Sequence, residues 1–85
     1  MAITLKQLRY LVAIRDERHF GRAAQSLHVT QPTLSHQLRK LEGMLGAQLV
    51  ERGHPVALTP VGREIATRAR GILNEVADIQ RLASR

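Results

Sequence analysis

The strongest constraint on the fold of this chain is a proline that stands in front of a leucine stripe. Leu34, Leu38 and Leu41 are separated by four and three residues, the spacing of the apolar face of an α-helix. Pro32 would break the interior of such a helix, but its missing N–H has no helical partner in a first turn. Thr30 is well suited to cap that turn. The pattern therefore predicts a helix that begins directly after Thr30 and continues to a glycine C-cap at position 46.

A tight turn is expected to connect this helix to a shorter one before it. The shorter helix is predicted over residues 20–27, whose apolar members recur at helical spacing, with His19 at the break before it. Ala24 is small enough for the next helix to cross closely, and His28 falls where such a turn often needs a positive φ. Val29 is then expected to close the core. A helix, a short turn and a second helix in this order predict a helix-turn-helix unit.

A further helix is predicted at the N-terminus of the chain. Thr4 and Gln7 have the spacing of a capping box, in which each side chain bonds the backbone N–H of the other residue. Apolar residues then recur at helical spacing as far as about Arg18.

The face opposite the leucine stripe has the order of side chains that a DNA-reading helix requires. The side chains of its first turns are short and polar, and those of its later turns are cationic. In a recognition helix the first turns contact base edges, and cations further along bind phosphates. The candidates for base contact are Gln31, Pro32, Thr33, Ser35 and His36. The candidates for phosphate contact are Thr30, Arg39, Lys40 and, on the preceding helix, Arg22. The alternative is a plain solvated face.

A small β-hairpin is predicted after this helix. Two short apolar runs, at residues 49–50 and 56–58, flank a turn-forming Gly-His-Pro sequence. Arg52 stands at the shoulder of the hairpin, where a cation can hold a phosphate or enter a minor groove. His54 at the tip is a second candidate for phosphate contact. The alternative for Arg52 is an exposed arginine paired with Glu51.

The last third of the chain predicts one long helix with a dimerisation seam. Thr59 is suited to cap it, and Pro60 suits its first turn. Apolar residues then alternate by three and four positions, as in the a/d seam of a coiled coil. The members of this seam, expected to pair with a second copy of the chain, are Gly62, Ile65, Ala69, Ile72, Val76, Ile79 and Ala83. The alternative is an amphipathic helix packed on its own domain, and packing of that kind is expected near Val61 and Leu73.

The length of the chain limits its domain organisation, and its net charge indicates the kind of partner it binds. The 85 residues suit a small DNA-binding domain at residues 1–58 followed by a linker or dimerisation helix at residues 59–85. A formal charge of +6 favours a polyanion, and nucleic acid is first among these. The alternatives are a solubility charge or a patch for anionic lipid. The chain shows neither a signal peptide nor an apolar run that could span a membrane, so a cytoplasmic protein is expected.

Two other functional classes compete with DNA binding. An enzyme or a metal protein is not expected, because the four histidines lack ligand spacing, cysteine is absent, and no nucleophile–base pair or Gly-rich phosphate loop is visible. No cofactor is predicted for the same reason. A pure oligomerisation module would use the seam but would leave the polar and cationic face unexplained. Salt-dependent binding to duplex DNA distinguishes a DNA-binding domain from such an oligomerisation module.

Four stretches of the chain resemble the N-terminal region of LysR-type transcriptional regulators. They are LKQLRYLVAI, HFGRAAQSLHVTQPTLSHQLRKLE, LGAQLVER and LTPVGRE. The resemblance implies a mainly α winged helix-turn-helix domain, a dimerising linker helix, and a homodimer on an interrupted palindrome of double-stranded DNA. It also implies an effector-sensing domain outside this chain, so a fragment of a longer bacterial regulator is expected. Within the family, HFGRAA and QPTLS are similar to the peroxide-sensing OxyR group.

The resemblance also assigns roles to positions. The family's base-contacting positions fall on the five base candidates named above, and its wing cation falls on Arg52. The chain departs from the family pattern twice. Many members have arginine where His36 stands, and the hairpin is one residue shorter and lacks the basic tip of many relatives. Contact through this wing is therefore expected to depend on Arg52 and His54.

Overall fold

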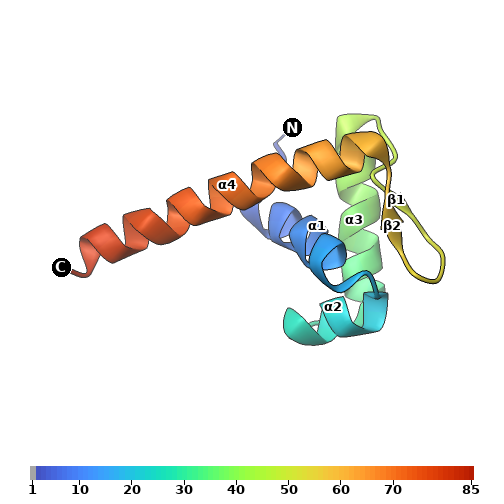
Figure 1. Cartoon of the computed structure of the whole chain (residues 1–85), viewed down its shortest axis with the longest axis horizontal. Coiled ribbons are helices and arrows are strands. Elements are labelled where there is room, and N and C mark those ends of the chain that lie inside the picture. Colours follow the sequence, from blue (N-terminus) through green and yellow to red (C-terminus); the bar gives the residue numbers. More distant parts are fainter. Residues whose placement is uncertain (1) are drawn as a thin grey trace.

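The computed structural model describes residues 2–85, which form helices and one β-hairpin (Figure 1). A body of three helices holds the hairpin, and the last helix crosses this body and extends beyond it (Figure 1). This confirms the predicted mainly α fold with a small hairpin. In chain order the elements are α1 (Leu5–Glu17), α2 (Phe20–Ser26), α3 (Gln31–Leu45), β1 (Val50–Glu51), β2 (Ala57–Leu58) and α4 (Pro60–Ala83).

Local capping sets the ends of the helices. Thr4 Oγ1 accepts a hydrogen bond from the Gln7 N–H at 3.1 Å, and the Thr4 N–H donates to Gln7 Oε1 at 3.0 Å. This is the predicted capping box. α1 ends one residue earlier than predicted, because Arg18 adopts the left-handed conformation with φ 54°. Gly46, with φ 65°, ends α3 at the predicted position.

The turn between α2 and α3 has the predicted backbone. His28 has a positive φ of 58°. Ala24 is buried, and its carbonyl accepts a hydrogen bond from the Val29 N–H at 3.0 Å. His19 lies at the predicted break and caps α2, because its Nδ1 accepts from the Arg22 N–H at 3.0 Å. The helix-turn-helix unit is therefore present.

The leucine stripe of α3 forms the centre of the core. Leu34, Leu38 and Leu41 are completely buried. Burial of a leucine side chain stabilises a fold by about 1.5–3 kcal/mol relative to its exposure. Leu45, which continues the stripe in the last turn of α3, is exposed and does not extend the core. The stripe packs with residues from the other helices and the hairpin, among them Leu11, Ile14, Ala23, Leu49, Val56, Leu58 and Ala66.

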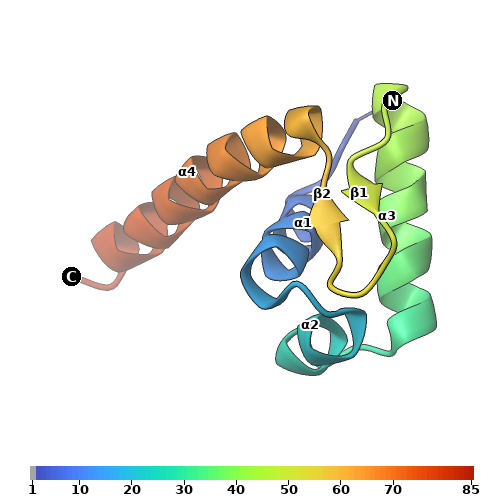
Figure 2. The ribbon, with the colours of Figure 1, turned by 45° about the vertical axis from the view of Figure 1, so that its right-hand side comes forward.

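The hairpin lies where the two apolar runs predicted it. β1 and β2 pair antiparallel, with Val50 opposite Leu58 and Glu51 opposite Ala57. Figure 2 shows the hairpin beside α3 with its tip directed towards α2. The wing therefore stands next to the start of α3, the part of the helix predicted to read bases.

α4 packs on α1 through small side chains. Ala66 and Ala69 are 0% and 1% exposed, and Ala69 contacts Leu8 and Val12 of α1. Leu73 is partly buried against the same residues, as predicted. Small side chains on α4 let the two helix backbones approach closely. This stripe of α4 is therefore buried against its own chain. The prediction that Ala69 belongs to a seam for a second copy is therefore wrong.

A second apolar stripe of α4 lies roughly 60–80° further around the helix. Ile72 and Ile79 on this stripe are 46% and 62% exposed, and Ala83 is exposed near the end of the helix. Val61 itself is exposed, but the neighbouring Gly62 is buried against the Leu49 backbone, so the packing expected near Val61 is present. Ile65 precedes Ile72 by seven residues and lies on the same side of α4, but it is partly buried against the core of its own chain.

Candidate nucleic-acid interface

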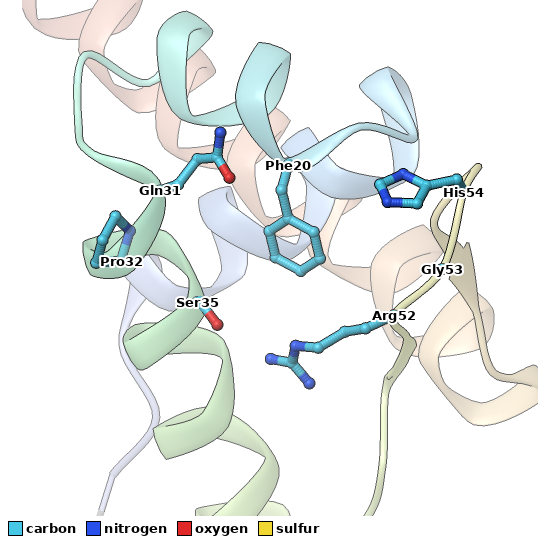
Figure 3. A pocket seen from close by; sticks show the side chains of 7 residues that line it. All are labelled: Phe20, Gln31, Pro32, Ser35, Arg52, Gly53 and His54. Carbon is cyan, nitrogen blue, oxygen red and sulfur yellow. The ribbon is translucent and has the colours of Figure 1, made fainter.

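A groove lies between the start of α3 and the hairpin (Figure 3). Its volume is about 730 Å³. In Figure 3, Arg52 extends from the hairpin towards α3, and the Ser35 hydroxyl faces the same space. The groove thus combines residues that the sequence analysis assigned separately to a recognition helix and to a wing. Its lining consists of Phe20, Gln31, Pro32, Ser35, Arg52, Gly53 and His54.

The remaining predicted contact residues of α3 lie outside the groove. Thr33, His36, Arg39 and Lys40 are exposed along the helix. Within residues 2–85, neither Arg39 nor Lys40 has a carboxylate within 4.0 Å. Both positive charges are therefore available to an anion outside the chain.

The Thr30 hydroxyl is occupied by the helix that it caps. Thr30 Oγ1 accepts from the Thr33 N–H at 3.2 Å, and the Thr30 hydroxyl donates to Thr33 Oγ1 at 2.9 Å. The hydroxyl hydrogen of Thr33 remains free to donate outwards. Thr33 is consequently better placed than Thr30 for an external contact.

Gln31 lies over a glycine of α2. A Cβ atom on Gly21 would be 3.1 Å from Gln31 Nε2 and 2.9 Å from His19 Cε1. The missing side chain of Gly21 therefore leaves room for the Gln31 amide beside α2. No sequence pattern indicated this role for Gly21.

Arg22, the phosphate candidate on α2, is paired within the chain. Its Nη2 donates to the Glu17 carbonyl oxygen at 3.3 Å, and its Nε lies 3.8 Å from Glu17 Oε1. The Arg22 side chain is nevertheless 63% exposed, and an ion pair as exposed as the one with Glu17 is weak. Arg22 lies outside the groove residues.

Arg52 is held in place by an acidic and an aromatic side chain. Its Nη1 lies 3.5 Å from Glu42 Oε1, and its guanidinium lies 5.6 Å from the centroid of the Phe20 ring. The Arg52 side chain is 28% exposed. The alternative of a pair with Glu51 is wrong, because the partner is Glu42 on α3.

Glu42 connects the hairpin to α3. Its Oε2 accepts from the Leu49 N–H at 2.8 Å and from the Val50 N–H at 3.2 Å, while its Oε1 faces Arg52. The side chain is only 14% exposed. No role for Glu42 was predicted from the sequence. Its position four residues after the buried Leu38 places a carboxylate at the edge of the core, which is the feature that could have indicated such a role.

Residues 2–85 contain no cluster of three His, Asp or Glu side chains that could hold a metal ion. In the same part of the chain, no helix is long and apolar enough to cross a membrane.

The sequence of residues 5–63, from α1 to the first turn of α4, matches the family described as "Bacterial regulatory helix-turn-helix protein, lysR family". The chain belongs to this family. Among similar proteins is the DNA-binding transcriptional dual regulator OxyR of Escherichia coli K12, which is 47% identical over 83 residues. The match covers 96% of this LysR-family chain and 27% of the relative. The chain therefore spans about a quarter of the length of this curated relative.

Solved structures show the same fold. The full-length OxyR of Pseudomonas aeruginosa, determined as a variant, matches with a TM-score of 0.93 and 46% identity, over 98% of this chain and 28% of that one. The BenM DNA-binding domain in a complex with DNA matches with a TM-score of 0.94 and 40% identity, over 98% of this chain and 94% of that one. These matches confirm the winged helix-turn-helix fold and the LysR-type resemblance.

Proposed function

We propose that this LysR-family chain binds double-stranded DNA sequence-specifically, as the DNA-binding unit of a bacterial transcription regulator. The observation that supports this most strongly is the groove that Gln31 and Ser35 of α3 line together with Arg52 of the hairpin. Such a groove places base-reading amides and hydroxyls beside a cation that can bind the phosphate backbone. The similar BenM domain was solved in a complex with DNA.

The proposed contacts divide into two kinds. Gln31, Thr33, Ser35 and His36 supply donors and acceptors for base edges, and Pro32 supplies an apolar surface for a thymine methyl group. The cations bind phosphates and supply affinity that depends on salt. They are Arg22, Arg39, Lys40 and Arg52, with His54 at the hairpin tip as a further phosphate contact. The Thr30 hydroxyl is not included, because its hydrogen is already donated to Thr33 Oγ1.

The homodimer is proposed to form through the exposed stripe of α4. The C-terminal half of α4 extends beyond the body of the chain, and Ile72 and Ile79 are exposed on it (Figure 1). Two copies that pair along this stripe, which also includes Val76 and Ala83, would bury these side chains. The dimer would present two α3 helices, and an interrupted palindrome is the matching DNA site.

A longer protein that contains this chain is proposed to respond to hydrogen peroxide and to act in the bacterial cytoplasm. Several relatives that are 47% identical to the chain are called hydrogen peroxide-inducible genes activators. The chain itself has no cysteine, so a thiol-based response would require residues outside it.

The experiment that tests DNA binding is a selection from a random library of DNA duplexes, followed by a salt titration on the selected sequences. We expect a two-fold symmetric motif and a steep decrease of affinity with salt. A steep salt dependence without an enriched motif would limit the chain to phosphate binding. Binding that is absent at low salt would contradict the proposal altogether.

A further inference from the structure

A second pocket lies on the side of α1, where the end of α1 meets β2 and the first turns of α4. Its volume is about 320 Å³, and it shares no residue with the groove beside α3. Ile14, Val56 and Leu58 are buried and form an apolar lining. The remaining lining residues are Ala57 and three arginines: Arg15, Arg18 and Arg63.

The positive charge around this pocket is only partly neutralised. Arg15 Nε lies 3.4 Å from Asp16 Oδ1. Within residues 2–85, neither Arg18 nor Arg63 has a carboxylate within 4.0 Å, and no acidic residue lines the pocket. The DNA-binding proposal uses none of these three arginines.

The pocket is held in shape by hydrogen bonds. Arg63 Nη1 donates to the Leu58 carbonyl oxygen at 3.0 Å, which fixes one edge of the guanidinium and leaves its other N–H groups free. The Arg18 N–H donates to the Ile14 carbonyl oxygen at 2.8 Å, and the Arg18 carbonyl oxygen accepts from the Val56 N–H at 3.1 Å. The first of these two bonds closes the end of α1, and the second ties that end to the residue before β2.

Arg18 itself stands in an unusual backbone conformation. Its φ of 54° lies in the left-handed region, where glycine and asparagine are the residues of low cost. Glycine there would satisfy the backbone but would remove a guanidinium from the rim of the pocket. This conformation ends α1, and the Arg18 side chain is among the residues that line the pocket.

We infer that this pocket binds an acidic segment of a partner protein, in which carboxylates flank an apolar side chain. Guanidinium groups bind carboxylates through paired, charge-assisted hydrogen bonds. The apolar lining requires an apolar group between the carboxylates, and the volume accommodates only a few side chains. The pocket shares no lining residue with the groove beside α3 that is proposed to bind DNA, which favours an acidic peptide over the same duplex.

The test is an NMR titration of the 85-residue chain with a blocked Glu-Leu-Glu tripeptide. A blocked Gln-Leu-Gln tripeptide and a DNA duplex are the comparison ligands. We expect the acidic peptide to shift the methyl resonances of Ile14, Val56 and Leu58, and the neutral peptide to leave them in place. The variant Arg18→Gln should lower the affinity for the acidic peptide roughly tenfold. The control Arg9→Gln, at an exposed arginine of α1 outside the pocket, should not change it.

Three outcomes would overturn the inference. Equal shifts with both peptides would reduce the pocket to an apolar contact. No shift with the acidic peptide, in wild-type chain of verified fold, would remove the site. Shifts of the same methyl groups by duplex DNA, with displacement of the peptide, would reassign the pocket to the phosphate backbone.

Discussion

Glu42 Oε1 lies 3.5 Å from Arg52 Nη1, and this contact joins α3 to the shoulder of the hairpin. The second oxygen of the same carboxylate accepts the N–H groups of Leu49 and Val50. One partly buried side chain therefore fixes both the position of β1 and the direction of the wing cation. The geometry of the proposed DNA interface depends on Glu42 although that residue does not line the groove.

The variant Glu42→Gln should destabilise the chain. The amide retains one acceptor oxygen but loses the charge that strengthens the bonds to Leu49 and Val50. We expect the free energy of unfolding to decrease by about 1–2 kcal/mol, and hydrogen exchange to accelerate at these two amides. Urea denaturation and amide exchange measure the two effects. Glu64→Gln, at an exposed position of α4, is the control, and equal effects of both substitutions would contradict the role of Glu42.

Arg52→Ala should weaken binding to all DNA sequences to a similar extent. A phosphate contact carries no direct sequence information, and its loss should reduce the slope of log affinity against log salt by about one. Fluorescence anisotropy at several salt concentrations provides this slope. Arg68→Ala, at an exposed arginine of α4 away from the groove, is the control. A loss restricted to particular sequences would show that Arg52 reads bases.

Gln31→Ala should relax the preference at one position of the site. The Gln31 amide lines the groove and can form paired hydrogen bonds with an adenine edge. We expect a cost of about 1–3 kcal/mol on the preferred sequence and a smaller cost on sequences changed at that position. Repetition of the library selection with the variant measures this. An unchanged motif would remove Gln31 from the base-reading residues.

Ile72→Glu and Ile79→Glu should each produce monomers. Both side chains lie on the exposed stripe of α4, so a glutamate there leaves the fold intact but would be buried in a dimer. Analytical ultracentrifugation measures the oligomeric state, with Gln80→Glu as the control at an exposed polar position. Ala69→Glu should instead unfold the chain, since that residue is buried against α1. A dimer that survives both isoleucine substitutions would contradict the proposed interface.

Two glycines of α4 should respond oppositely to alanine. A Cβ on Gly62 would lie 2.0 Å from the Leu49 carbonyl oxygen, whereas a Cβ on Gly71 would meet nothing within 4 Å. Gly62→Ala should lower the free energy of unfolding by about 3 kcal/mol, because the neighbouring atom belongs to the backbone. Gly71→Ala should raise it by about 0.5–1 kcal/mol, because alanine favours a helix. Thermal and urea denaturation measure both, and similar stabilities of the two variants would refute the close approach at Gly62.

The features that could be predicted from the sequence depend on residues close together in the chain. Thr30 caps α3 with Pro32 in its first turn, and His28 takes the positive φ that the turn requires. A cap or a turn involves three or four consecutive residues, so their identities suffice. The leucine stripe of α3 was predicted for the same reason, because helical periodicity alone places Leu34 and Leu38 on one face.

The tertiary structure decided which of several chemically similar residues meet. Glu51 and Glu42 could both pair with Arg52, and only the placement of the hairpin on α3 selects Glu42. Ala69 and Ile72 both fit one heptad pattern, yet α1 covers Ala69 and leaves Ile72 exposed. Periodicity places a residue on a helix face to within about a quarter turn. Which residues of that face are covered depends on shifts of a few ångströms in the position of the neighbouring helix or hairpin. Such distances depend on how whole elements pack, which residues near in sequence do not determine.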